Sequence, residues 1–162
     1  MSVRDLVYSL YERRLLGQLE GAERPRHVGV ILDGNRRWAR ATGAGGPSSG
    51  HRRGADHITN LLGWCDQAGV QIVTLWLLST DNLARPAAEL EPLLAIIEST
   101  VEGLAASNRP WRVHPMGSLD LLPGDTAQVL KEAAEGTNDR PGVHVNIAVA
   151  YGGRREIADA VR

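Results

Sequence analysis

The clearest candidates for chemistry follow the first apolar run of the sequence, in the stretch Asp33-Gly-Asn-Arg-Arg-Trp38. Glycine lets a backbone approach a ligand closely, and the start of a helix favours anions. Arg36, Arg37 and Arg40 add guanidinium groups that bind phosphate through several hydrogen bonds. A lone carboxylate among these cations fits Mg²⁺ bridged to phosphate. The stretch therefore predicts a metal–diphosphate site. On these residues alone, an Asp N-cap on a helix with a solvated basic face fits equally well.

Two further polar stretches have a similar setting, because each follows an apolar run and precedes a helical pattern. Ser79-Thr-Asp-Asn-Leu-Ala-Arg-Pro86 offers hydroxyls, a carboxylate, an amide and a guanidinium, although turn-favouring residues at a helix entry would look the same. Tyr151-Gly-Gly-Arg-Arg-Glu156 could form an anion-binding nest, but two glycines alone favour an ordinary turn. His51 begins a helical pattern. A lone histidine is more often structural than catalytic, but the neighbouring Arg52 and Arg53 add support for an anion-facing role.

The elements that must position these residues alternate along the chain. Short apolar, β-branched runs predict buried strands at 27–32, 70–78, 111–116 and 143–149. Helical periodicity predicts helices at 2–20, 35–41, 51–67, 86–106, 121–135 and 154–162. Pro115 disfavours a central place for the third strand, and the Gly/Pro/Ser-rich residues 43–50 predict a mobile loop. The alternation predicts an α/β fold, with a central, mainly parallel sheet flanked by helices. Its carboxyl edge would gather the three polar stretches.

Length and composition set limits on domain number and partners. The 162 residues fit one domain at 27–162, preceded by an amphipathic helix and linker at 1–26, with Ser2 as its N-cap. We expect this helix to pack on the domain, with peripheral contact to a membrane surface as the alternative. A net charge of −1 argues against nucleic acid as a partner. A single cysteine, Cys65, expected to be buried, rules out a disulfide framework and favours a reducing, cytoplasmic location.

Four ordered motifs carry a resemblance to a known family. The stretch His27–Arg40, centred on Asp33–Trp38, resembles the signature of the cis-prenyltransferases, or Z-isoprenyl diphosphate synthases, which include undecaprenyl diphosphate synthase. The other three motifs match in order: Gly50-His51 with Gly54-Ala55, then Ser79–Pro86, then Asn146–Arg154. Leu83 and the Arg-Arg pair are most similar to actinobacterial short-chain members such as Z-farnesyl diphosphate synthase.

The resemblance implies a Mg²⁺-dependent transferase. It would condense isopentenyl diphosphate with an allylic diphosphate, such as geranyl or farnesyl diphosphate, into a Z-configured polyprenyl diphosphate, and it would be a homodimer. Asp33 would bind Mg²⁺ and help the allylic diphosphate depart, and Asn82 would assist proton removal from isopentenyl diphosphate. The helices at 51–67 and 86–106 would wall an apolar tunnel. The expected substrate-binding residues are Gly34, Asn35, Arg36, Arg37, Trp38, His51, Ser79, Thr80, Asp81, Leu83 and Arg85.

The sequence also departs from the family pattern. Asp81 replaces the usual Glu, Leu83 stands where long-chain members have Trp, and Pro47 lies near the place of a common Arg. Family members continue beyond the position of Arg162 with residues that bind isopentenyl diphosphate and complete the metal site. We therefore expect the domain to be incomplete at its C-terminus. The alternative functions are a non-catalytic subunit that pairs with a full-length synthase, and a degenerate fragment.

Overall fold

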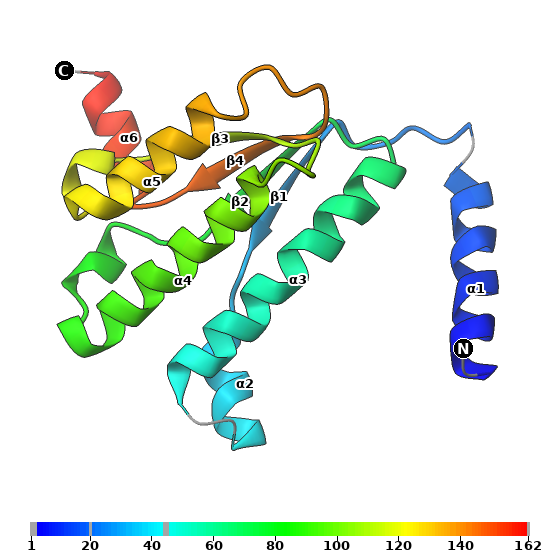
Figure 1. Cartoon of the computed structure of the whole chain (residues 1–162), viewed down its shortest axis with the longest axis horizontal. Coiled ribbons are helices and arrows are strands. Elements are labelled where there is room, and N and C mark those ends of the chain that lie inside the picture. Colours follow the sequence, from blue (N-terminus) through cyan, green and yellow to red (C-terminus); the bar gives the residue numbers. More distant parts are fainter. Residues whose placement is uncertain (1–2, 20, 44–45, 162) are drawn as a thin grey trace.

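A computed structural model describes residues 3–19, 21–43 and 46–161 (Figure 1). The helices found there are α1 (Val3–Leu19), α2 (Asn35–Thr42), α3 (Pro47–Gln67), α4 (Ala87–Ala105), α5 (Gly124–Glu135) and α6 (Gly153–Ala160). The strands are β1 (His27–Ile31), β2 (Ile72–Trp76), β3 (Arg112–Met116) and β4 (His144–Ala148), each inside its predicted range. Two short 3₁₀ turns, η1 (Asp81–Ala84) and η2 (Leu119–Leu121), complete the description.

The strands form a parallel sheet in the order β1-β2-β4-β3. The predicted α/β fold with a parallel sheet is therefore confirmed. β3 lies at the edge of the sheet in the described chain, where Pro115 is tolerated because only one side of that strand has to donate to a neighbour. Parallel pairing puts the carboxyl ends of β1 and β2 side by side, and the two polar stretches that follow these strands therefore begin at the same edge.

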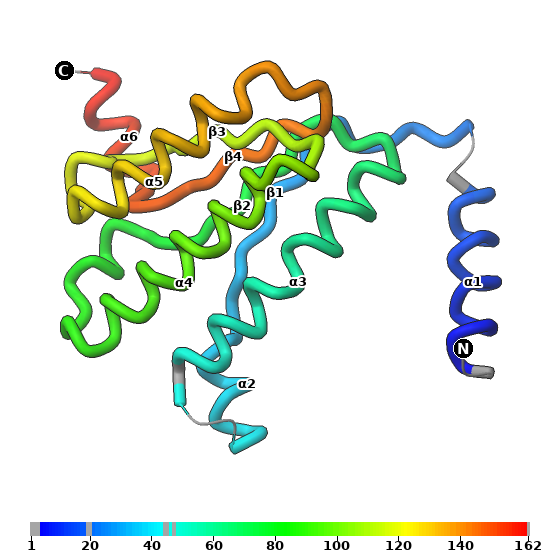
Figure 2. Tube along the Cα trace, in the orientation of Figure 1, coloured from blue at the N-terminus to red at the C-terminus, as the bar shows by residue number. Residues whose placement is uncertain are grey.

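One face of the sheet carries the core. Val73, Val113 and Val145 share a register and are almost fully buried, and they belong to the same apolar cluster as side chains of α3, α4 and α5. Figure 2 shows these three helices running beside one another along the sheet. Cys65 is buried, as predicted.

The opposite face of the sheet is mixed in the described structure, with polar side chains near the middle and the exposed apolar side chains of Ile31 and Trp76 at the carboxyl ends of β1 and β2. His27 bonds the Thr74 hydroxyl at 2.8 Å, and Asn146 donates to the same oxygen at 3.1 Å. β1 alternates between exposed and half-buried residues, and Ile31 is 65% exposed. The prediction that this strand is buried is therefore wrong, because only Val28 and Val30 of β1 pack against the core.

Helix α3 begins earlier than the sequence suggests. Residues 43–50 were expected to form a loop, but 47–50 are the first turn of α3, and Gly50 is buried. A Cβ at Gly50 would lie 2.1 Å from the backbone oxygen of Asn35, and one at Gly54 would lie 2.7 Å from the Asn35 side-chain oxygen. These two glycines are one helical turn apart, so their missing side chains allow α2 to pack directly on α3. Ala44 and Gly45 lie outside the described residues.

Prolines explain the starts of two other helices. The helix expected from Leu121 begins instead at Gly124, after Pro123, and η2 precedes it. The residue before a proline is pushed out of the helical region, and Leu122 accordingly has an extended backbone. Pro86 holds Arg85 extended in the same way, directly before α4. The proline positions therefore define where polar loop residues end and helices begin.

Helix α1 stands apart from the rest of the molecule (Figure 1). It forms no substantial packing contact with any other described element, so the expectation that it packs on the domain is wrong. Its large apolar side chains are 40–61% exposed, and at 100° per residue they spread around most of the helix rather than forming one face. The N-cap predicted at Ser2 lies outside the described residues. Leu6, Val7, Tyr8, Leu10, Tyr11, Leu15 and Leu16 make up this exposed set.

We predict that Gly50→Ala lowers the free energy of unfolding by roughly 1–3 kcal/mol, because the new methyl group must push the Asn35 carbonyl away. Gly63→Ala on the same helix is the matched control, since nothing lies within 4 Å of its Cβ position. That variant should gain up to about 1 kcal/mol from helix propensity. Urea denaturation measures both variants. Equal stabilities for the two would contradict the close contact between α2 and α3.

Candidate active site

A cavity of about 450 Å³ opens at the carboxyl ends of β1 and β2, between α3 and α4. Its mouth is polar and basic, and its depth is apolar. The sequence-predicted residues that line it are Asp33, Gly34, Asn35, Arg36, Arg37, His51, Ser79, Asn82 and Arg85. The fold therefore brings most of the predicted site together from two polar stretches and the start of α3.

The first stretch leaves β1 and enters α2 through Gly34. Gly34 has φ 86°, in the left-handed region that favours glycine, and it is the residue that caps α2. The Asp33 carboxylate accepts the Gly34 N–H and lies 3.4 Å from the Arg37 guanidinium, with both side chains 80% exposed. The alternative of Asp33 as N-cap is therefore wrong. Its carboxylate stays accessible at the cavity mouth, where the first N–H groups of α2 have no intrahelical acceptors.

The second stretch is folded by η1, which presents Asn82 and Arg85 to the cavity. The Arg85 guanidinium donates to Asn82 Oδ1 at 2.8 Å and to Glu89 Oε1 at 3.0 Å. The same Glu89 oxygen lies 3.5 Å from Arg36, which comes from the first stretch. Glu89 therefore links the two stretches, and the sequence analysis did not identify it. Its position four residues after Arg85, a typical spacing for an ion pair on a helix, was the available signal.

His51 lies on the first half of α3 and faces the basic mouth. Its Nε2 atom is buried and meets no hydrogen-bond partner among the described residues. Burial first, and then the charges of Arg85 and Arg36, lower the pKa of His51 below its ordinary 6.5, while Glu89 acts in the opposite direction. A buried polar atom without a partner costs free energy, so this nitrogen is suited to a ligand or a water in the cavity.

The third stretch stabilises the second rather than entering this cavity. Ser79 forms a bridge with Tyr151, and the Thr80 N–H donates to the Tyr151 carbonyl at 3.3 Å. A Cβ at Gly152 would lie 2.8 Å from the Thr80 hydroxyl, so this glycine provides room for Thr80. The glycine pair forms the start of α6, with Gly152 as its N-cap and Gly153 as its first residue. Tyr151 and Gly152 line a separate hollow of about 200 Å³.

The depth of the cavity is made by apolar side chains of α3, α4 and the end of β2. Ile58, Leu78, Leu93 and Ile97 are each at most 6% exposed and line its wall. The expectation that the helices near 51–67 and 86–106 wall an apolar cavity is thus confirmed for these side chains. A ligand with a charged head and a hydrocarbon tail fits this division between mouth and depth.

Four predicted substrate-binding residues lie outside the cavity wall. Trp38 is 42% exposed on α2, and Asp81 is exposed on η1. Leu83 packs against the core, and Thr80 packs against Gly152. Their predicted contacts with substrate stay predictions. Trp76 at the end of β2 does line the mouth, and the sequence analysis did not select it.

The carboxylates near the cavity fit a metal only together with a ligand. Across the described ranges, no cluster of three or more His, Cys, Asp or Glu side chains is placed to hold a metal ion. Asp33 supplies one accessible carboxylate, and Glu89 is already paired with two guanidinium groups. Mg²⁺ commonly takes one or two protein carboxylates and completes its shell with phosphate oxygens and water. The donor set therefore fits Mg²⁺ brought together with a diphosphate.

Comparison with known proteins identifies the family. A family model described as "Putative undecaprenyl diphosphate synthase" matches residues 31–162. The chain belongs to the cis-prenyltransferase family. It is 66% identical to (2Z,6E)-farnesyl diphosphate synthase of Thermobifida fusca, over 96% of this chain and 61% of that protein. It is 54% identical to isoprenyl transferase 1 of Streptomyces avermitilis, over 99% of this chain and 62% of that protein.

A solved structure of a cis-prenyltransferase relative agrees with this assignment. Lavandulyl diphosphate synthase from Lavandula x intermedia, in complex with dimethylallyl diphosphate, superposes with a TM-score of 0.79 at 32% identity. The match covers 85% of this chain and 60% of that protein. The chain thus spans about three fifths of the length of the relatives it matches. None of the helices described here is both long and apolar enough to cross a membrane.

We predict that His51 makes stability depend on pH. Between its lowered pKa and 6.5, the unfolded chain binds a proton at His51 that the folded chain does not, so the free energy of unfolding rises with pH in that window. Acidification from above pH 6.5 should therefore destabilise the wild type more than His51→Gln. Urea denaturation across this pH range measures the difference. Identical pH profiles for the two proteins would show that His51 titrates alike in the folded and unfolded chains.

Proposed function

We propose that this protein condenses isopentenyl diphosphate with an allylic diphosphate, such as geranyl or farnesyl diphosphate, to give a short Z-configured polyprenyl diphosphate. The observation that carries the proposal is the accessible Asp33 carboxylate at the basic mouth of an apolar cavity. The relatives named above bear the names of synthases and transferases, which favours catalysis over a binding subunit. The family domain is assigned to 27–162, with 1–26 as a separate helix and linker.

In this proposal, Asp33 would hold Mg²⁺ together with the allylic diphosphate. When bound, Mg²⁺ neutralises charge on the departing diphosphate. Gly34 and Asn35 are assigned backbone N–H contacts with the diphosphate at the start of α2, where the helix dipole also favours an anion. The Gly34 N–H would exchange its present bond to the Asp33 carboxylate for one to the diphosphate. Arg36 and Arg37 add guanidinium donors from the same turn. These donors are fixed before the carbon–oxygen bond breaks, so little reorganisation is needed as charge develops on the leaving group.

The second stretch would contact isopentenyl diphosphate. Asn82 is assigned to assist proton removal from this substrate after the new carbon–carbon bond forms. Its Oδ1 accepts from Arg85, and arginine can only donate, so the amide oxygen must face the guanidinium. His51 Nε2 is unpartnered in the cavity wall and is available to a diphosphate oxygen. We assign Ser79, Thr80 and Asp81 to the same substrate-contacting stretch, and Trp38 and Leu83 to its supports.

The apolar depth would hold the hydrocarbon tail. Ile58, Leu93 and Ile97 exclude water from the region next to the reacting carbons, which protects an allylic cation from hydrolysis. A cavity of about 450 Å³ lies in the range of pockets that hold compact ligands.

The partners and location follow from surface features. We propose a cytoplasmic homodimer. The unpaired, buried Cys65 supports the reducing location, and the family resemblance supports the dimer. The exposed leucines and tyrosines of α1, together with Arg13 and Arg14, support peripheral contact with a membrane surface. The net charge of −1 gives no support for nucleic acid as a partner.

We predict that Asp33→Ala lowers turnover at least 10²–10³-fold, because the variant loses the group that couples Mg²⁺ to the leaving diphosphate. Turnover is measured as incorporation of labelled isopentenyl diphosphate into extractable product, with geranyl or farnesyl primer and Mg²⁺. The assay uses the protein expressed from its complete gene. Asp33→Ala should also abolish the Mg²⁺-dependent part of pyrophosphate binding, as measured by calorimetry.

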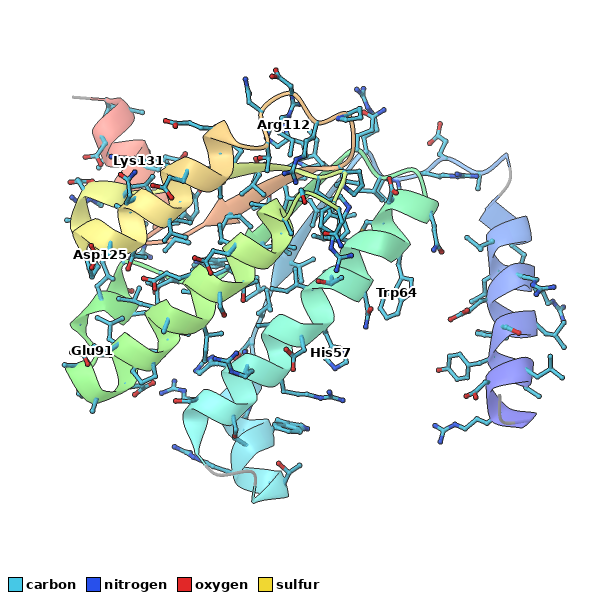
Figure 3. All side chains as sticks on the ribbon, in the orientation of Figure 1. His57, Trp64, Glu91, Arg112, Asp125 and Lys131 are labelled. Atoms are coloured by element: carbon cyan, nitrogen blue, oxygen red, sulfur yellow. The ribbon has the colours of Figure 1, made fainter. Side chains whose placement is uncertain are left out.

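The matched control is Asp125→Asn. Asp125 lies in the first turn of α5, outside the cavity, and Figure 3 shows it near the start of that helix. This variant should retain wild-type turnover and metal-assisted binding. If Asp33→Ala keeps both properties as well, the proposed metal–diphosphate site is wrong. If the wild-type protein makes no product, the proposed condensation is wrong.

A further inference from the structure

Glu89 occupies a central place in the network at the cavity mouth. It lies in the first turn of α4, and one of its carboxylate oxygens is 3.0 Å from Arg85 and 3.5 Å from Arg36. Arg36 belongs to the start of α2, whereas Arg85 ends the stretch after β2. A single carboxylate therefore connects the two halves of the site, which are 49 positions apart in sequence (85 minus 36).

The contact with Arg85 has the better geometry. The Arg85 and Glu89 side chains are only 19% and 28% exposed, so water screens this pair less than it screens a surface pair. Arg85 donates from Nη1 to Glu89 and from Nη2 to Asn82 Oδ1, and these two hydrogen bonds fix the plane of the guanidinium. The orientation of the Asn82 amide thus depends on an arginine that Glu89 holds.

We propose that Glu89 is a positioning residue for the reaction, which sets Arg85 and through it the Asn82 amide, and which keeps Arg36 beside them. The inference rests on the proposed condensation. Glu89 is not among the residues that line the cavity, so we assign it no direct contact with substrate. Its effect should appear in the rate of the chemical steps, because displacement of a reacting group by about 1 Å costs up to 10²-fold in rate.

A direct contact between Glu89 and substrate would make the opposite prediction for binding. The mouth carries the guanidinium groups of Arg36, Arg37 and Arg85 and the carboxylates of Asp33 and Glu89, so neutralising Glu89 leaves the mouth more positive. A more positive mouth attracts a diphosphate more strongly. Positioning therefore predicts a fall in kcat without a rise in KM, whereas loss of a substrate contact would raise KM.

We test the proposal with Glu89→Gln, Glu89→Ala and the control Glu91→Gln, in the protein as its gene encodes it. Gln keeps a hydrogen-bond acceptor for Arg85, and Ala keeps none. We expect kcat to fall about tenfold for Gln and up to 10²-fold for Ala, with KM for both diphosphates unchanged or lower. Glu91 is exposed on the same helix, away from the cavity, and Figure 3 shows it on the outside of α4. Its variant should match the wild type.

Further measurements separate the explanations. Calorimetry with inorganic pyrophosphate and Mg²⁺ reports binding without turnover, and we expect affinity in Glu89→Gln to equal or exceed that of the wild type. Unchanged kcat in Glu89→Ala, equal losses for Gln and Ala, or a raised KM would each overturn the positioning role. Asp33→Ala is the reference for the proposed function. If it loses turnover while Glu89→Ala does not, the function stands and only this inference fails.

Discussion

The site depends on how positive charge is held in place at the ends of two parallel strands. Three guanidinium groups and two carboxylates meet at the cavity mouth, and the arginines come from both polar stretches. Positive charges this close to one another repel, unless counter-charges lie between them and hydrogen bonds hold them in place. Asp33, just before α2, pairs with Arg37 in the first turn of that helix, and Glu89 pairs with Arg36 and Arg85 across the mouth. The mouth is therefore basic and still ordered, as preorganised binding of an anion requires.

This arrangement requires that α2 and α3 lie in direct contact. Gly50 and Gly54 provide the space, because any side chain at either position would meet Asn35. The same first turns of α3 carry His51, so the packing that brings the helices together also places an unpartnered imidazole nitrogen beside Arg36 and Arg85. The packing of α3 buries that nitrogen without a hydrogen bond, which costs folding free energy. A hydrogen bond to a diphosphate in the mouth would offset this cost. Fold stability and ligand affinity are linked here through one helix pair.

The alternation of elements and the first polar stretch could be predicted from sequence because their signals are local. Apolar runs mark the strands, prolines mark helix starts, and the Asp33-Gly34 step marks the end of β1. The start of α3 could not be predicted, since residues 47–50 have loop composition and the packing of Gly50 on Asn35 joins residues that are distant in sequence. The role of Glu89 depends on Arg36, which is distant in sequence. The separation of α1 from the domain was also missed, because apolar content does not say what a helix contacts.

The contrast between the mouth and the depth of the cavity also explains why the polar network needs support from a helix. In the proposed condensation, ionisation of an allylic diphosphate creates a cation that water would capture, so the apolar side chains around Ile58, Leu93 and Ile97 would have to stay dry. Charged groups beside such a region are poorly screened and shift easily toward solvent. Glu89 lies on the same helix as Leu93 and Ile97, which follow it by one and two turns. A single rigid element thus carries both the apolar wall and the carboxylate that keeps the arginines at its edge.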